Sequence, residues 1–163
     1  MTDPVRFTLN GVPQEVAVPL DRALVDILRE EIGAVEAKVG CAVGRCGACM
    51  VLVDGAPRNG CLVMAWQIDG RQVETARGLD GQADAETVRA ALDAEVAFQC
   101  GYCAPGIVAS LVALFRARPQ ADEAAIRTAL EGHVCRCTGY HSILRGARAA
   151  AARLRDTDRK AAE

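Results

Sequence analysis

Apolar and polar residues alternate twice near the start of the chain, over residues 5–9 and again over residues 15–18. Such alternation is typical of β-strands with one buried face, and the Asn10-Gly11 pair between the two runs is the strongest short-range signal of a tight turn. The pattern therefore predicts that a β-hairpin opens the protein.

A helical spacing of apolar residues follows the hairpin. It runs from Leu24 to Ile32, with Asp21 as the candidate N-cap and Gly33 as the stop. We expect one helix to pack against the hairpin.

Residues 50–53 are continuously apolar, which favours a central strand covered on both faces, and Asp54-Gly55 predicts the turn that follows. Residues 62–66 are interpreted as a short helix or loop that shields Cys61, with Trp66 as a core residue, and residues 72–75 as a closing strand. Two strands, a helix, a loop and further strands indicate a small mixed sheet around a helix, an α+β layout.

Strand signals disappear after residues 78–81, so we place a boundary between two domains there, over residues 1–78 and 79–163. The second domain is predicted to be a compact four-helix bundle, because many of its facing residues are alanine and allow close packing. The last ten residues, 154–163, are expected to form a polar, frayed tail. Four segments carry apolar residues at helical spacing: Val88, Ala91, Leu92 and Val96; Ile107, Val108, Leu111, Val112 and Phe115; Ile126, Ala129 and Leu130; and Ile143, Ala147, Ala150 and Leu154.

Composition excludes several classes of function. The 163 residues carry 19 basic and 21 acidic side chains, and a net charge of −2 gives no electrostatic footprint for nucleic acid or an anionic membrane. The apolar runs are too short to span a bilayer and the first residues do not resemble a signal peptide, so we expect a cytoplasmic protein. No catalytic triad, phosphate loop or dinucleotide fingerprint occurs, so this chain alone is not expected to bind substrate.

Eight cysteines are far more than packing requires, and they fall as four in residues 41–61 and four in residues 100–137. The first three have the C-x4-C-x2-C spacing of plant-type ferredoxins, which need a fourth thiolate further along to hold a two-iron cluster. We define the first cysteine set as Cys41, Cys46, Cys49 and Cys61. Three glycines lie beside these ligands and let N–H groups turn toward anionic sulfur: Gly40, Gly44 and Gly47.

The other four cysteines form a C-x2-C between the first and second predicted helices of the bundle and a C-x-C between the third and fourth. Antiparallel helices would bring both loops to one end of the bundle, where four sulfurs can meet a second cluster. We define the second cysteine set as Cys100, Cys103, Cys135 and Cys137. Pro105 suits the first turn of the helix that follows, whose N-terminus points a partial positive charge at the thiolates.

Zinc is the main alternative ligand. Zinc sites usually pair two C-x2-C knuckles or combine cysteine with histidine, and the second set taken alone could equally bind zinc. His133 and His141 flank the C-x-C, but four cysteines are already available, so we do not expect histidine ligands of the Rieske kind.

Together the two sets carry a family resemblance, through the stretches Gly40–Cys49, Gln99–Gly106 and Cys135–Tyr140. The chain resembles the small iron–sulfur subunit, or N-terminal domain, of the molybdenum hydroxylases, the family of xanthine oxidase, aldehyde oxidoreductase and carbon monoxide dehydrogenase. This resemblance implies a ferredoxin-like β-grasp domain with a [2Fe–2S] cluster on the first cysteine set, and a four-helix domain with a second [2Fe–2S] cluster on the other.

The resemblance also implies partners and an electron path. A large subunit would carry molybdopterin (cytosine) dinucleotide and a medium subunit FAD, in a heterotrimer or a dimer of heterotrimers. Electrons from the oxidative hydroxylation of an aldehyde, purine or other N-heteroaromatic compound would enter the helical-domain cluster and leave from the ferredoxin-like cluster to FAD or another acceptor. Gln99 and Cys137 would lie against the pterin. The alternative hypothesis is a structural zinc or redox-regulatory cysteine module.

Overall fold

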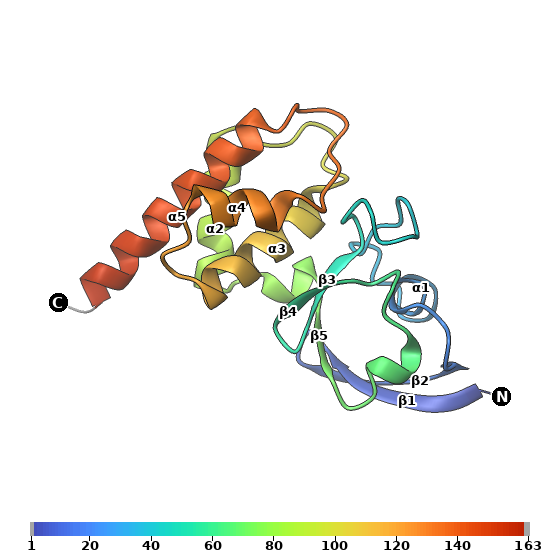
Figure 1. The fold of residues 1–163 in the computed structure, drawn as a ribbon. Coiled ribbons are helices and arrows are strands. Elements are labelled where there is room, and N and C mark those ends of the chain that lie inside the picture. The colour runs from blue at the N-terminus through green and yellow to red at the C-terminus, as the bar shows by residue number, and fades with distance from the viewer. Residues whose placement is uncertain (1, 162–163) are drawn as a thin grey trace.

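The computed structural model describes residues 2–161, which form a five-stranded sheet and a set of helices beside it (Figure 1). The predicted α+β class is confirmed. The sheet has the strand order β2-β1-β5-β3-β4. None of the helices within residues 2–161 is long and apolar enough to cross a membrane.

The predicted hairpin consists of β1 (Thr2–Leu9) and β2 (Val12–Pro19), which pair antiparallel. Asn10 and Gly11 have φ of 52° and 81°, and a two-residue type I′ turn requires positive φ at both positions. Within β1, the alternating residues Val5, Phe7 and Leu9 are buried, as the sequence pattern predicts.

The strand β3 (Met50–Val53) lies inside the sheet, antiparallel to both β4 (Ala56–Asn59) and β5 (Gln72–Glu74), and β5 runs parallel to β1. Val51 and Leu52 are fully buried in two different cores: Val51 packs with the sheet residues and Leu52 with the helices. The prediction of a strand covered on both faces is confirmed.

The helix after the hairpin begins at Leu24, with Ala23 and not Asp21 at its N-cap. It consists of α1 (Leu24–Asp26) and a π-helical segment (Ile27–Glu31), and Gly33 ends it with φ of 81°. The buried residues Leu24, Val25, Ile27 and Leu28 pack against the sheet core.

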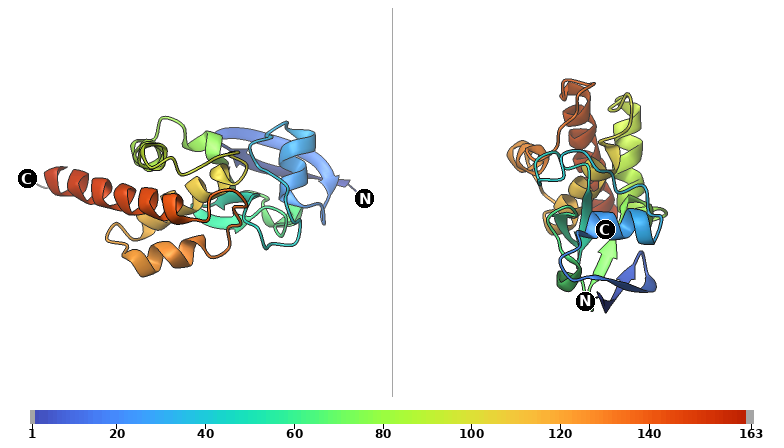
Figure 2. Two further views of the ribbon diagram at one scale, coloured as in Figure 1. Left: turned by 90° about the horizontal axis from the view of Figure 1, so that it is seen from above. Right: turned by 90° about the vertical axis from the view of Figure 1, so that its right-hand side faces the viewer.

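Four helices follow: α2 (Ala83–Ala94), α3 (Ala104–Ala117), α4 (Glu123–Leu130) and α5 (His141–Ala161). Helix α2 contacts α3 and α5, and α4 contacts α3 and α5. Helix α3 also packs on β3, so it lies between the sheet and the other helices and every residue from Gly106 to Ala113 is buried (Figures 1 and 2). This contact joins the two halves of the chain.

Three further expectations were wrong. Helix α2 ends at Ala94, and Val96 is 74% exposed with φ of 49°, because the chain reverses there: Ala97 N–H bonds Leu92 O and Val96 N–H bonds Asp93 O, the two bonds of a Schellman cap. Trp66 is 61% exposed, because a short 3₁₀ helix (Ala65–Gln67) turns Ala65 inward instead. Of the expected frayed tail, residues 154–161 continue α5, and residues 162–163 lie outside the described residues.

Candidate functional site

The first cysteine set lies on the long loop before β3, with Cys61 contributed from just after β4. Backbone hydrogen bonds close this loop, from Lys38 N–H to Ala48 O at 3.2 Å and from Gly60 N–H to Cys49 O at 3.0 Å. The chain thereby brings Cys61 back to the other three cysteines. All eight cysteines of the protein are free thiols.

Backbone N–H groups point at the sulfurs of this set. Cys41 Sγ accepts from Val43 N at 3.4 Å and from Arg45 N at 3.2 Å. Cys46 Sγ accepts from Cys41 N at 3.3 Å, and Cys61 Sγ accepts from Gly44 N at 3.2 Å. A loop that turns its amide donors toward sulfur is arranged to stabilise negative charge on thiolates.

Two of the three glycines beside these ligands have close neighbours in or next to this set. A Cβ on Gly40 would lie 2.8 Å from Cys46 Sγ. A Cβ on Gly44, whose φ is 75°, would lie 2.3 Å from Leu62 Cδ1. A side chain at either position would push the loop away from the sulfurs or displace Leu62.

The thiols of the set differ in acidity. Hydrogen bonds from Val43 and Arg45 N–H lower the pKa of Cys41 to about 6, whereas burial raises the pKa of Cys49 to about 12. A buried thiol of this kind loses its proton when a cation coordinates it. Cys41 is thus acidic without a metal, whereas Cys49 would lose its proton only on binding one.

The second cysteine set is assembled from the two loops that the sequence predicts. Cys100 Sγ and Cys137 Sγ lie 3.5 Å apart, although 37 residues separate them in the chain. Cys103 is buried at the N-cap of α3, and burial raises its pKa to about 12. Cys135 Sγ accepts a hydrogen bond from Thr138 Oγ1 at 3.1 Å. Four sulfurs from two helix–helix connections therefore meet at one end of the helices.

Only the second set includes exposed cysteines. Cys49 and Cys61 of the first set are buried, whereas Cys100 and Cys137 of the second set are exposed, as is Gln99 beside them. The outer face of the second set, including Gln99, is therefore open to a partner molecule.

The donor groups of the two sets have the chemistry that a two-iron cluster requires. A [2Fe–2S] cluster spreads its four thiolates over two iron atoms. Each set supplies four sulfurs, and the first set adds glycines beside its cysteines and N–H groups that point at the sulfurs.

Two tyrosines beside the cysteines have hydrogen-bonding roles. Tyr140 Oη accepts from Cys135 N at 2.9 Å and donates to His133 O at 3.2 Å, and Tyr102 Oη donates to Val39 O at 2.7 Å. Their position within five residues of a cysteine is the signal that could have found them.

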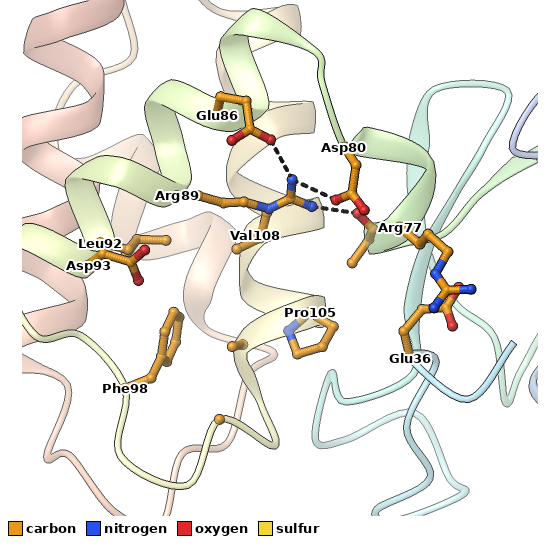
Figure 3. A pocket seen from close by; sticks show the side chains of 13 residues that line it. Glu36, Arg77, Asp80, Glu86, Arg89, Leu92, Asp93, Phe98, Pro105 and Val108 are labelled. Carbon is orange, nitrogen blue, oxygen red and sulfur yellow. Dashed lines mark hydrogen bonds and ion pairs between the residues drawn. The ribbon is translucent and has the colours of Figure 1, made fainter.

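A cavity of about 610 Å³ lies between residues 76–80, α2 and the start of α3 (Figure 3). Its lining includes Gly101 and Ala104 but no cysteine. Arg89 bridges Asp80 and Glu86, at 2.8 Å each, and so ties the segment between the halves to α2. The cavity belongs to this junction and lies next to the second cysteine set without containing its sulfurs.

Comparison with known proteins gives the family. Residues 7–79 match the 2Fe-2S iron-sulfur cluster binding domain model, and residues 75–148 match the [2Fe-2S] binding domain model. The chain is 44% identical to a probable xanthine dehydrogenase subunit from Bacillus subtilis, over 87% of this chain and 82% of the relative. It is 36% identical to a nicotinate dehydrogenase subunit from Pseudomonas putida, over 93% of this chain and 96% of the relative.

The fold gives the same assignment. A crystal structure of quinoline 2-oxidoreductase from Pseudomonas putida 86 superposes with a TM-score of 0.86 and 33% identity, over 95% of this chain and 97% of the matched chain. The chain therefore belongs to the family of small [2Fe–2S] subunits of the molybdenum hydroxylases, which are oxidoreductases.

Proposed function

We propose that this chain transfers electrons within a molybdenum hydroxylase through two [2Fe–2S] clusters, one on each cysteine set. The observation that carries the proposal is the pair of separate four-sulfur sites, the first surrounded by N–H donors. When bound, each cluster would accept and release one electron at a time. The chain's residues would hold the clusters, exclude water from the buried side and set the potentials through hydrogen bonds to sulfur.

We propose the direction of transfer that the family resemblance implies, and the exposure of the second cysteine set supports a docking site there. Electrons would enter at the second cysteine set, where Cys100 and Cys137 reach the surface, and would leave from the first. Gln99 is exposed beside Cys100, and its side-chain amide can hydrogen-bond a pterin. The pterin would be the molybdopterin (cytosine) dinucleotide of a large subunit, and the acceptor FAD on a medium subunit.

The surface supports docking of such partners. Five exposed apolar side chains lie within two residues of a cysteine: Val39, Val43, Leu62, Tyr102 and Val134. Apolar and aromatic residues enrich the buried centres of protein interfaces. We propose a heterotrimer, or a dimer of heterotrimers, in the cytoplasm.

The two sites also suggest how the chain is divided. We propose a ferredoxin-like domain over residues 1–78 and a four-helix bundle domain over residues 79–163, each holding one cluster. The relatives' names refer to xanthine, nicotinate and quinoline. We propose that the substrate is a purine or another N-heteroaromatic compound, as these names suggest, or an aldehyde, as the family resemblance allows, and that it is oxidised on the large subunit.

Metal analysis and low-temperature EPR test the proposal. Two clusters predict four iron atoms and four acid-labile sulfides per chain, and two distinct signals after reduction. Zinc in place of iron, or a colourless protein without EPR signals, would refute the proposal and leave the alternative of a structural zinc or redox-regulatory module. In the assembled enzyme, Cys100→Ala should abolish reduction of flavin by substrate, and unchanged turnover would contradict the electron path.

A further inference from the structure

The loop of the first cysteine set is wedged against the helical half at Gly47. A Cβ on Gly47 would lie 2.3 Å from Nδ1 of His133 and 2.7 Å from the Gly132 carbonyl oxygen. On the other side, a Cβ on Gly106 of α3 would lie 2.2 Å from the Gly47 carbonyl oxygen. The main chain of Gly47 therefore occupies a slot between His133 and the first turn of α3.

The imidazole that forms one wall of this slot is held firmly. His133 is 3% exposed, and its Nε2 lies 2.7 Å from Ser110 Oγ on α3, which is also buried. The His133 main chain is fixed as well, by a hydrogen bond from its N–H to Leu130 O at 3.0 Å and by one from Tyr140 Oη to its carbonyl. The ring can move little without breaking these bonds.

The same segment bonds directly to a residue of the first cysteine set. Val134 N–H donates to the Cys46 carbonyl oxygen at 2.9 Å. Val134 lies between His133 and Cys135, a member of the second set. The contact of His133 with Gly47 and the bond from Val134 to Cys46 therefore join the two sets through adjacent residues.

Simple packing does not account for a histidine here. Its Nδ1 is buried without a hydrogen-bond partner and faces Gly47. A buried unsatisfied nitrogen is unfavourable, and an apolar side chain would avoid it. What histidine adds is a flat, rigid ring that bonds α3 on one edge and contacts the loop with the other.

We propose that His133 is a positioning residue that fixes the separation and orientation of the two cysteine sets. The inference rests on the proposed function, because this spacing matters to electron transfer when both sets hold clusters. The rate of electron transfer between two redox centres falls steeply with the distance between them. Their magnetic dipolar coupling falls with the cube of the same distance. A loop free to shift at Gly47 would alter both.

The experiment compares four variants of the full-length chain in its assembled enzyme. His133→Ala removes the ring, Ser110→Ala removes the bond that holds it, and His133→Gln keeps a group that can bond Ser110. His141→Ala is the matched control, because His141 is exposed at the start of α5. The readouts are iron content, the dipolar splitting of the EPR signals with both clusters reduced, and the rate of electron transfer between the clusters.

We expect His133→Ala to keep four iron atoms, to change the dipolar splitting and to slow electron transfer between the clusters. In His133→Gln the splitting and the transfer rate should lie between those of His133→Ala and the wild type. His141→Ala should match the wild type. Unchanged splitting and rate in His133→Ala would overturn the inference. If His133→Ala loses its clusters, the splitting and the transfer rate are measured in Ser110→Ala instead, and unchanged values there would overturn the inference. A wild-type protein without two EPR signals would instead refute the proposed function.

Discussion

Replacing Gly47 by alanine measures how tightly the first cysteine loop is held against the helices. Gly47 has φ of 69°, and a left-handed conformation costs an L-residue about 1–2 kcal/mol. The new methyl would also lie 2.3 Å from His133 Nδ1, and overpacking of this kind costs about 1–3 kcal/mol. We therefore expect Gly47→Ala to lower the free energy of unfolding by about 2–5 kcal/mol.

Gly55 provides a matched control in the same half of the protein. Its φ is 77°, close to that of Gly47, but a Cβ there would meet nothing within 4 Å. Gly55→Ala should thus lose about 1–2 kcal/mol, the backbone part alone. The double variant Gly47→Ala/His133→Ala should destabilise less than the two single changes added together, because removing the ring makes room for the methyl.

The assay is urea unfolding followed by far-UV circular dichroism and by the visible absorbance of the clusters. With a urea m-value of about 2 kcal/mol/M, a difference of 2 kcal/mol between the two glycine variants moves the midpoint by about 1 M. Equal midpoints for Gly47→Ala and Gly55→Ala would refute the reasoning, since they would mean that no side chain crowds Gly47.

Three further predictions follow from single features of the structure. Val96→Gly should raise Tm by about 2–4 °C in a calorimetric scan, because glycine relieves the left-handed strain of a β-branched residue. The control Val35→Gly, at an exposed valine without positive φ, should lower Tm. Hydrogen bonds from Arg116 lower the pKa of Asp84 below 3.8. The pair therefore stabilises the fold above the unfolded pKa of Asp84, and this stability is lost as pH falls through the folded pKa. Asp84→Asn should make the urea midpoint depend less on pH below about pH 4, and an unchanged pH dependence would contradict this. Cys103→Ala should reduce iron from four atoms to two per chain and remove one EPR signal, and loss of both signals would show that the sets do not assemble independently.

Local features of the fold were predictable from the sequence because their causes are local. The Asn10-Gly11 turn is dictated by the positive φ that it requires, and the buried strand at residues 50–53 by its unbroken apolar run. The same reasoning failed at Val96 and Trp66. An apolar residue at a helical spacing can equally lie beyond a helix end or on an outward face, and periodicity alone does not distinguish these positions.

The sequence by itself determined the donor chemistry of this protein: eight thiols in two groups, with spacings that suit [2Fe–2S] clusters and glycines beside the first group. The tertiary structure decided how the two groups relate. Gly47 and His133 are 86 positions apart, and they meet because α3 packs on β3 and carries Ser110 and Gly106 to the first cysteine loop. No local pattern encodes that contact, because it depends on the sheet and the helices sharing α3 as a common buried element.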